Sequence, residues 1–150
     1  MATVEVTFTP LPVHVRTARL VATAVARRSG VAESLLDEVR LAVGEACSRA
    51  VEAHLRHCPG TPIRVELTDN GEQFEVVVTD AVPEAADGNG AGSGDTSVGH
   101  GGFAVLDGEA PLQLPDGVGL AVIAGLADDV RIASAGLGTS VTMSWKRRAG

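Results

Sequence analysis

Two patterned runs on either side of Asp69-Asn70-Gly71 constrain the fold of this chain more than any other feature. Apolar residues occupy every second position before and after this tripeptide. They are Ile63, Val65 and Leu67 on one side and Phe74, Val76 and Val78 on the other. A period of two is typical of half-buried strands, and Asn-Gly between such runs is a strong signal for a type I′ hairpin. The sequence therefore predicts two antiparallel strands, the second ending at Asp80.

A strand and two helices are predicted ahead of this hairpin. Residues 3–9 alternate as an opening strand, and apolar residues recur at helical spacing over 13–28. A second apolar stripe keeps the same period from Ser34, its predicted N-cap, to about residue 58. Both helices are amphipathic, so each is expected to cover a face of the sheet.

The sequence loses its regularity after the hairpin. Residues 83–116 show little periodicity, and ten of the 18 glycines fall between Gly88 and Gly119. A loop of this length inside a compact domain is usually functional or disordered. The pattern then predicts a short buried helix over 117–127 and strands over 130–133 and 139–145.

This order of elements predicts an α+β fold. Antiparallel strands whose helices all cover one face form a two-layer sandwich with a mostly antiparallel sheet. A chain of 150 residues suits one core, so residues 1–150 are expected to be a single domain with 83–116 as its long loop.

Charge and apolar content exclude several classes of function. The chain has 19 acidic and 12 basic residues, a net charge of −7, which disfavours direct binding to nucleic acid or to an anionic membrane. Its longest nearly apolar stretch, 117–127, is far shorter than the roughly 20 residues of a membrane-spanning helix. Cys47 and Cys58 lie in one predicted helical region and are expected to be reduced thiols, as in a cytoplasmic protein.

Glu45 is the first residue that could carry chemistry. It lies on a charged flank of the second predicted helix, beside the apolar stripe. The alternative interpretation is a solvated flank with ion pairs between Glu45 and Arg49 and between Glu52 and Arg56, four residues apart.

Asp80 and the pair Gly117 and Gly119 are the other candidates. Asp80 ends a predicted strand just before the long loop, a place where aspartate also serves as a simple turn former. The two glycines begin a predicted helix, where exposed main-chain N–H groups favour a phosphate, although paired glycines also allow tight packing.

Taken in this order, these features resemble the GHKL, or Bergerat, ATPase superfamily. More narrowly, the sequence resembles the anti-sigma-factor serine kinases of bacterial regulatory switches. The sharpest matches are Leu-Ala-Val-Gly-Glu-Ala at 41–46 and the segment 116–130, and the resemblance extends from the first strand through Lys146. It implies a histidine-kinase-like ATPase fold in which ATP or ADP lies between the second helix, the sheet and a lid formed by the glycine-rich loop.

The resemblance implies a role for each matching position. Glu45 matches the acidic residue that orients or activates the attacking hydroxyl. Asp80 matches the carboxylate that accepts a hydrogen bond from the adenine amino group, and Thr139 matches a hydroxyl near the adenine. Gly117 and Gly119 match glycines on the phosphate side of the nucleotide.

Two positions depart from the family pattern. Arg49 stands where the family has an asparagine that holds Mg²⁺, and a guanidinium cannot ligate a metal. We therefore expect no metal site and weak or absent kinase activity, with Arg49 either contacting a phosphate directly or pairing with Glu45 when no nucleotide is bound. Val82 replaces a glycine, and its branched side chain is expected to crowd a close approach of the backbone.

The function that the resemblance implies is that of an anti-sigma-factor-type regulator. Its partners would be a sigma factor and an anti-sigma-factor antagonist, with Arg19 of the first helix matching an arginine that touches protein partners. ATP would be a ligand or the phosphoryl donor to a serine of the antagonist, and family members often form homodimers. The alternative is a degenerate domain that binds proteins without any nucleotide.

Two further features are predicted to have no catalytic role. His54, His57 and Cys58 lack a recognisable zinc spacing and are expected to be solvent-facing residues at the end of the second helix. Trp145 alternates with Met143 in the last predicted strand and is expected to pack in the core or at an edge.

Overall fold

The structure, a computed structural model, describes residues 2–82, 116–135 and 138–147. The described residues form five strands, three α-helices and one 3₁₀ turn. In chain order these are β1 (Ala2–Phe8), α1 (Pro12–Arg28), the 3₁₀ turn η1 (Glu33–Leu35), α2 (Leu36–His57), β2 (Ile63–Asp69), β3 (Gln73–Asp80), α3 (Asp116–Leu126), β4 (Asp129–Ala135) and β5 (Gly138–Lys146).

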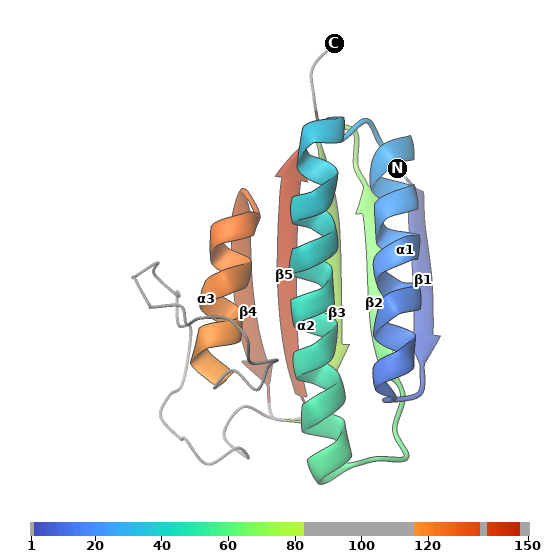
Figure 1. The fold of residues 1–150 in the computed structure, drawn as a ribbon, viewed down its shortest axis with the longest axis vertical. Coiled ribbons are helices and arrows are strands. Elements are labelled where there is room, and N and C mark those ends of the chain that lie inside the picture. The colour runs from blue at the N-terminus through green and yellow to red at the C-terminus, as the bar shows by residue number, and fades with distance from the viewer. Residues whose placement is uncertain (1, 83–115, 136–137, 148–150) are drawn as a thin grey trace.

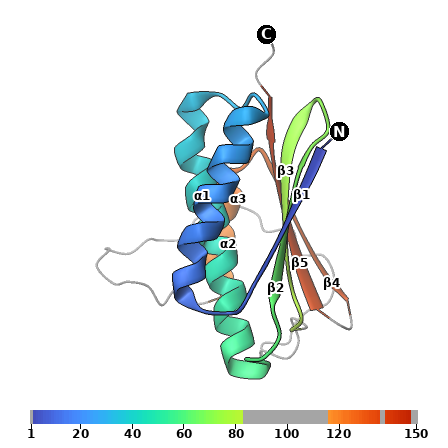
Figure 2. The same ribbon diagram turned by 90° about the vertical axis from the view of Figure 1, so that its right-hand side faces the viewer.

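The strands form one antiparallel sheet in the order β1-β2-β3-β5-β4. All three helices lie on the same face of this sheet, and Figure 2 shows the helices and the strands as two separate layers. The predicted α+β two-layer sandwich is therefore confirmed. β3 is the middle strand, and it pairs with β2 from the hairpin on one side and with β5 from the end of the chain on the other.

The core lies between the two layers. The helix-facing positions of β2, β3 and β5 are buried, including Phe74 and Trp145, whose ring centroids lie 6.2 Å apart on adjacent strands. α2 contacts α1, α3 and β3, and it buries mainly small side chains such as Ala42, Ala46 and Ala50. Small residues along its buried face allow this helix to pack close to its neighbours. Trp145 is fully buried, as predicted.

The start of α2 differs from the sequence prediction. Ser34 was predicted to be the N-cap, but it lies inside the 3₁₀ turn η1, and α2 begins at Leu36 with no side-chain cap. The 3₁₀ turn leads directly into the helix, and its own hydrogen bonds take the place of a cap. A serine followed by an acidic residue three positions later was therefore a misleading signal here.

The hairpin turn also differs from the prediction. The register pairs Asp69 with Phe74, and the N–H of Asn70 donates a hydrogen bond of 3.2 Å to the main-chain oxygen of Gln73, so Gly71 and Glu72 form the tip of the hairpin. The Asn70 side chain accepts hydrogen bonds from the N–H groups of Glu72 and Gln73, and Asp69 accepts one from Gly71. Gly71 has a φ of +96°, which suits glycine. The antiparallel pairing is as predicted, but the tip of the hairpin lies one residue later than the Asn-Gly signal indicates.

The later elements agree with their predicted positions. α3 begins at Asp116, and β4 and β5 extend the predicted strands by one or two residues at their ends. The predicted lid loop, 83–116, lies outside the described residues except for its last residue. None of the described helices has the length and apolar content needed to cross a membrane. Both cysteines are free thiols.

We predict that Trp145→Phe lowers the free energy of unfolding by about 1–3 kcal/mol. The indole Nε1 donates a hydrogen bond to the main-chain oxygen of Leu126 at the end of α3, so the substitution leaves a buried acceptor unpaired and a small cavity. Urea unfolding followed by far-UV circular dichroism measures the change. Met143→Leu, a substitution of similar volume in the same strand, is the control and should cost less than about 1.5 kcal/mol. Equal stability of the two variants would contradict this account.

Candidate functional site

Most of the predicted site residues gather at one end of the molecule. Asp80 is the last residue of β3, and it pairs in register with Thr139 near the start of β5. In Figure 1 the end of β3, the beginnings of β5 and α3, and the C-terminal half of α2 all lie at the lower end. The sheet and the helix layer thus bring together residues that are far apart in the sequence.

Asp80 is a buried carboxylate whose partners in the protein do not fully replace the water that it loses. Its side chain is 3% exposed, and Oδ1 accepts a hydrogen bond of 2.8 Å from the N–H of Val82. Oδ2 lies 3.6 Å from Nη1 of Arg49, which is an ion pair but too long for a hydrogen bond. Burial raises the pKa of the Asp80 carboxyl, while backbone hydrogen bonds from Val82 and Thr139 and the nearby Arg49 guanidinium act in the opposite direction. Such a perturbed carboxyl is typical of functional sites.

The backbone that follows Asp80 is held against β5. The hydroxyl of Thr139 donates a hydrogen bond of 2.9 Å to the main-chain oxygen of Val82. A β-carbon on Gly138 would lie 2.2 Å from the main-chain oxygen of Asp80, so this position accommodates no other residue without a shift of the backbone. Val82 itself is buried, and its N–H and C=O both have partners. The Val82 backbone is therefore engaged in the turn itself.

His54 lies in this cluster, contrary to prediction. It was expected to be solvent-facing at the end of α2, but it is fully buried. Its Nδ1 lies 2.8 Å from the main-chain oxygen of Thr61, and its Nε2 accepts a hydrogen bond of 2.8 Å from the N–H of Ala81. A carbonyl oxygen can only accept, so Nδ1 carries the proton and the imidazole is neutral.

Arg49 pairs with Asp80 and not with Glu45. The ion pairs predicted on the flank of α2, between Glu45 and Arg49 and between Glu52 and Arg56, do not form among the described residues. Arg49 instead reaches β3, with its side chain 13% exposed. Its Nε is buried and has no hydrogen-bond partner within the described part of the chain. The guanidinium therefore has one donor that remains available.

Glu45 lies one turn before Arg49 on α2 and is half-buried. Burial raises the pKa of its carboxyl, and the neighbouring charge of Glu52 adds to the effect. A carboxyl with a raised pKa is suited to proton transfer, which is the role that the family resemblance gives to this position. Among the residues that the structure describes, no hydrogen-bond or ion-pair partner orients it.

Gly117 and Gly119 lie in the first turn of α3. This helix packs along α2 and begins at the end of the molecule where β3 ends (Figure 1). The free N–H groups of a helix N-terminus, together with its dipole, favour an anion. The two glycines thus stand where a phosphate group would approach the same end of the sheet as Asp80.

The residues described here do not fit a Mg²⁺ ion. Within the described ranges, no group of three or more His, Cys, Asp and Glu side chains is arranged to hold a metal. The position where the family has an asparagine ligand carries Arg49, whose guanidinium lies against the one buried carboxylate of the cluster. A cation in this place repels a second cation and offers it no lone pair.

Arg19 lies away from this cluster, on the α1 side of α2. Its aliphatic part crosses Gly44, where a β-carbon would lie 2.7 Å from Cδ of Arg19. Cys47 follows one turn later, and burial raises the pKa of its thiol to about 12, with a smaller opposite effect from Arg19. Gly44 therefore leaves room for the half-buried arginine to lie along α2.

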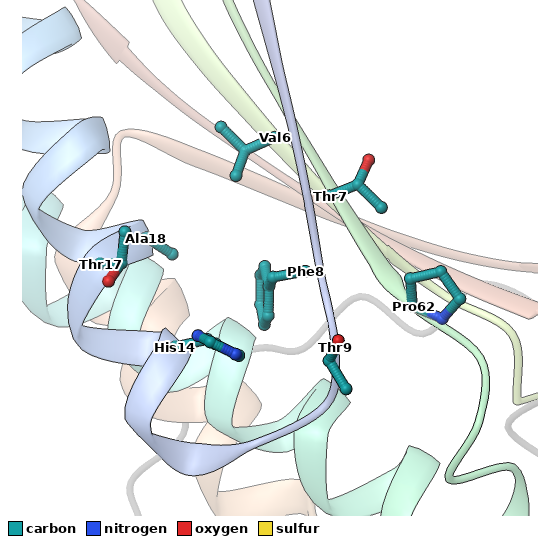
Figure 3. A pocket seen from close by; sticks show the side chains of 8 residues that line it. All are labelled: Val6, Thr7, Phe8, Thr9, His14, Thr17, Ala18 and Pro62. Carbon is teal, nitrogen blue, oxygen red and sulfur yellow. The ribbon is translucent and has the colours of Figure 1, made fainter.

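A separate hollow of about 460 Å³ lies between β1 and α1. Figure 3 shows Phe8 and His14 facing each other across it, with ring centroids 6.1 Å apart. No predicted site residue lines it. The lining residues are Val6, Thr7, Phe8, Thr9, His14, Thr17, Ala18 and Pro62. The hollow belongs to the edge of the sheet that is opposite to β4, so it is not part of the Asp80 cluster.

Comparison with known families agrees with this geometry. The family model of the histidine kinase-like ATPase domain matches residues 8–145. The chain belongs to this family. An ATPase domain implies nucleotide binding in general.

A solved structure supports the fold of this ATPase domain. The crystal structure of the RsbU and RsbW domains of Rv1364c from Mycobacterium tuberculosis matches with a TM-score of 0.63 and 18% sequence identity. The match covers 99% of this chain and 34% of the other, so this chain spans about a third of that protein's length. A search of curated proteins found no match.

His54 is the residue of the cluster that sequence analysis missed. Its position one turn from the end of α2 suggested a solvated helix end, and the sequence alone gave no partner for it. One signal was available: Ala50, Val51 and His54 continue the apolar stripe of α2 at a spacing of three to four residues. A histidine on the buried face of a helix calls for a hydrogen-bond partner on the sheet.

We predict that Glu45→Gln raises the thermal stability of the nucleotide-free domain at pH 7 but not at pH 4. Burial and Glu52 raise the folded-state pKa of Glu45 above its ordinary value of 4.5. The folded state then retains the proton longer than the unfolded state, so stability falls as the pH rises through this window. Glutamine removes that cost, which for a half-buried side chain amounts to a few degrees at most.

Thermal melts at pH 4, 5, 6 and 7 test this prediction. Glu52→Gln is the comparison variant, because it removes the neighbouring charge and should give a smaller gain over the same pH range. A difference between Glu45→Gln and the natural protein that does not depend on pH would show that ionisation of Glu45 has no part in it.

Proposed function

We propose that this ATPase domain is an anti-sigma-factor-type regulator that binds an adenine nucleotide at Asp80. The observation that carries the proposal is the state of the Asp80 carboxylate. Oδ1 accepts a hydrogen bond from the N–H of Val82, the backbone of Thr139 supplies a further hydrogen bond to the carboxyl, and Oδ2 lies 3.6 Å from Nη1 of Arg49, too far for a direct hydrogen bond. A buried acceptor of this kind suits the exocyclic amino group of adenine, which is a hydrogen-bond donor.

Four elements would hold the nucleotide. Asp80 and Thr139 would contact the adenine, and the first turn of α3, with Gly117 and Gly119, would lie on the phosphate side. Arg49 supports this arrangement because its Nε is buried without a described partner and its guanidinium binds phosphate well. When a base takes Oδ2 of Asp80, Arg49 is free to turn toward the phosphates.

We further propose that the domain transfers the phosphoryl group of ATP slowly or not at all. Glu45 would orient the attacking hydroxyl of an antagonist's serine, but the charge of the transferred group needs compensation that Arg49 alone supplies in place of a metal. ADP and ATP would therefore serve chiefly as ligands that set the shape of the partner-binding surface. Phosphorylation of an antagonist would be slow or absent.

The charge of α1 supports a role in binding protein partners. This helix has four arginines and no acidic residue, in a chain of net charge −7. Val13 and Leu20, both more than half exposed, lie on the same helix as the half-buried Arg19. Cationic and apolar side chains on one helix favour an acidic, partly apolar protein surface. The proposed partners are a sigma factor and an anti-sigma-factor antagonist, and a homodimer is a further expectation of the family.

The alternative is a protein-binding module that has lost its nucleotide. The ion pair between Arg49 and Asp80 favours it, because the guanidinium already stands against the oxygen that adenine would use. If this pair is permanent, the domain binds its partners without a ligand.

Titration calorimetry with ADP distinguishes the two. We predict micromolar or tighter binding by the natural protein and at least about tenfold weaker binding by Asp80→Asn, in which an amide donor replaces Oδ2. Asparagine keeps the acceptor for Val82 and removes a buried charge, so the variant should remain folded. Absence of binding at millimolar ADP would favour the nucleotide-free module.

We also predict that Mg²⁺ leaves the ADP affinity of the natural protein unchanged but increases that of Arg49→Asn. Asparagine removes the repelling cation and supplies an oxygen ligand. Arg49→Ala is the matched control, because it breaks the ion pair to Asp80 without offering a ligand. Titrations with Mg²⁺ and with EDTA measure the effect, and a similar response of the asparagine and alanine variants would contradict the metal-site argument.

A further inference from the structure

We infer that His54 is a positioning residue of the nucleotide site, which acts on Asp80 through the N–H of Ala81. The inference rests on the proposed adenine contact at Asp80. His54 touches neither the carboxylate nor any group proposed to meet the nucleotide. Its two ring nitrogens bond to main-chain groups on two different segments, the N–H of Ala81 and the oxygen of Thr61.

The turn after β3 is fixed by three hydrogen bonds on three successive main-chain groups. The Ala81 N–H bonds to His54, the Val82 N–H to the Asp80 carboxylate, and the Val82 oxygen to the Thr139 hydroxyl. Two of these bonds come from within the sheet. The bond to His54 is the one that comes from α2. It therefore sets the distance between the turn and the helix layer.

The sheet side of the turn is already bounded by β5. The main-chain oxygen of Asp80 lies so close to Gly138 that no β-carbon would fit between them. Without the bond to His54, Thr139 and Gly138 still hold the turn against β5, but a movement of the turn relative to α2 is no longer restrained by a hydrogen bond from that helix. Arg49 approaches Asp80 from that same helix, so such a movement changes the distance between the guanidinium and the carboxylate. The adenine preference of the site therefore depends on His54.

The two bonds of His54 can be separated by substitution. In His54→Gln the longer side chain places an oxygen near the position of Nε2, so it retains an acceptor for Ala81 and loses the bond to Thr61. In His54→Asn the shorter side chain places its amide near Nδ1, so it retains a donor to Thr61 and loses the acceptor for Ala81. Each variant retains one of two buried bonds, which makes the pair a matched comparison.

The experiment compares the affinities of ADP and inosine diphosphate for the natural protein and the two variants. Inosine diphosphate lacks the amino group that Asp80 would recognise. We expect His54→Gln to retain the preference for ADP within about threefold, and His54→Asn to lose about tenfold in ADP affinity with little change for inosine diphosphate. A folding defect would weaken both nucleotides alike, so the ratio of the two affinities reports position rather than stability.

A second measurement does not use nucleotide. Hydrogen exchange at the Ala81 amide should be faster in His54→Asn than in His54→Gln, because only asparagine leaves this N–H without an acceptor. Equal ADP preference in the two variants would overturn the inference for His54 while leaving nucleotide binding by the domain intact. Failure of the natural protein to bind ADP would overturn the proposed function and this inference together, and the amide exchange would then report only a structural bond.

Discussion

The pairing of β3 with β5 is the constraint on which the rest of the structure depends. A short hairpin joins β3 to β2 on one side, whereas the strand on its other side, β5, comes from the end of the chain. The hydrogen bond between Thr139 and Val82 joins residues 57 positions apart. Closing so long a segment costs conformational entropy, which the burial of Phe74 against Trp145 helps to offset. Without this pairing Asp80 would end an edge strand and would have no Thr139 beside it.

The same pairing explains why a carboxylate is tolerated at a buried position. Asp80 gains a hydrogen bond from Val82 and the field of Arg49, but these do not restore the solvation that it loses, and its pKa stays raised. A domain selected for stability alone would place an uncharged residue here. The remaining cost in free energy is consistent with the proposed contact between Asp80 and a ligand. The neighbouring polar side chains, His54 and Thr139, are also buried and also need hydrogen-bond partners.

The fold could be predicted from the sequence because its signals are local and repeated. The alternation around the hairpin extends over several residue pairs, and the apolar stripe of α2 extends over several helical turns. In both cases the residues that the pattern marks as apolar are the ones that the tertiary structure buries. The details that failed are single-residue features: a 3₁₀ turn takes the place of the Ser34 cap, and the tip of the hairpin lies at Gly71 and Glu72, one residue later than the Asn-Gly signal. The site was predicted only in part, because Asp80 stood at a strand end, whereas the partners of Arg49 and His54 depend on which strand lies beneath α2.

Gly138 shows what such a site demands of the sequence around it. The main-chain oxygen of Asp80 is by itself enough to require the absence of a side chain at this position. Among relatives of this chain, a glycine retained at this place would thus record the contact between two strands. Glycines near a nucleotide site are often explained by contact with the ligand. Gly138 would be needed even in a related protein that no longer bound the ligand, as long as that protein kept the same sheet.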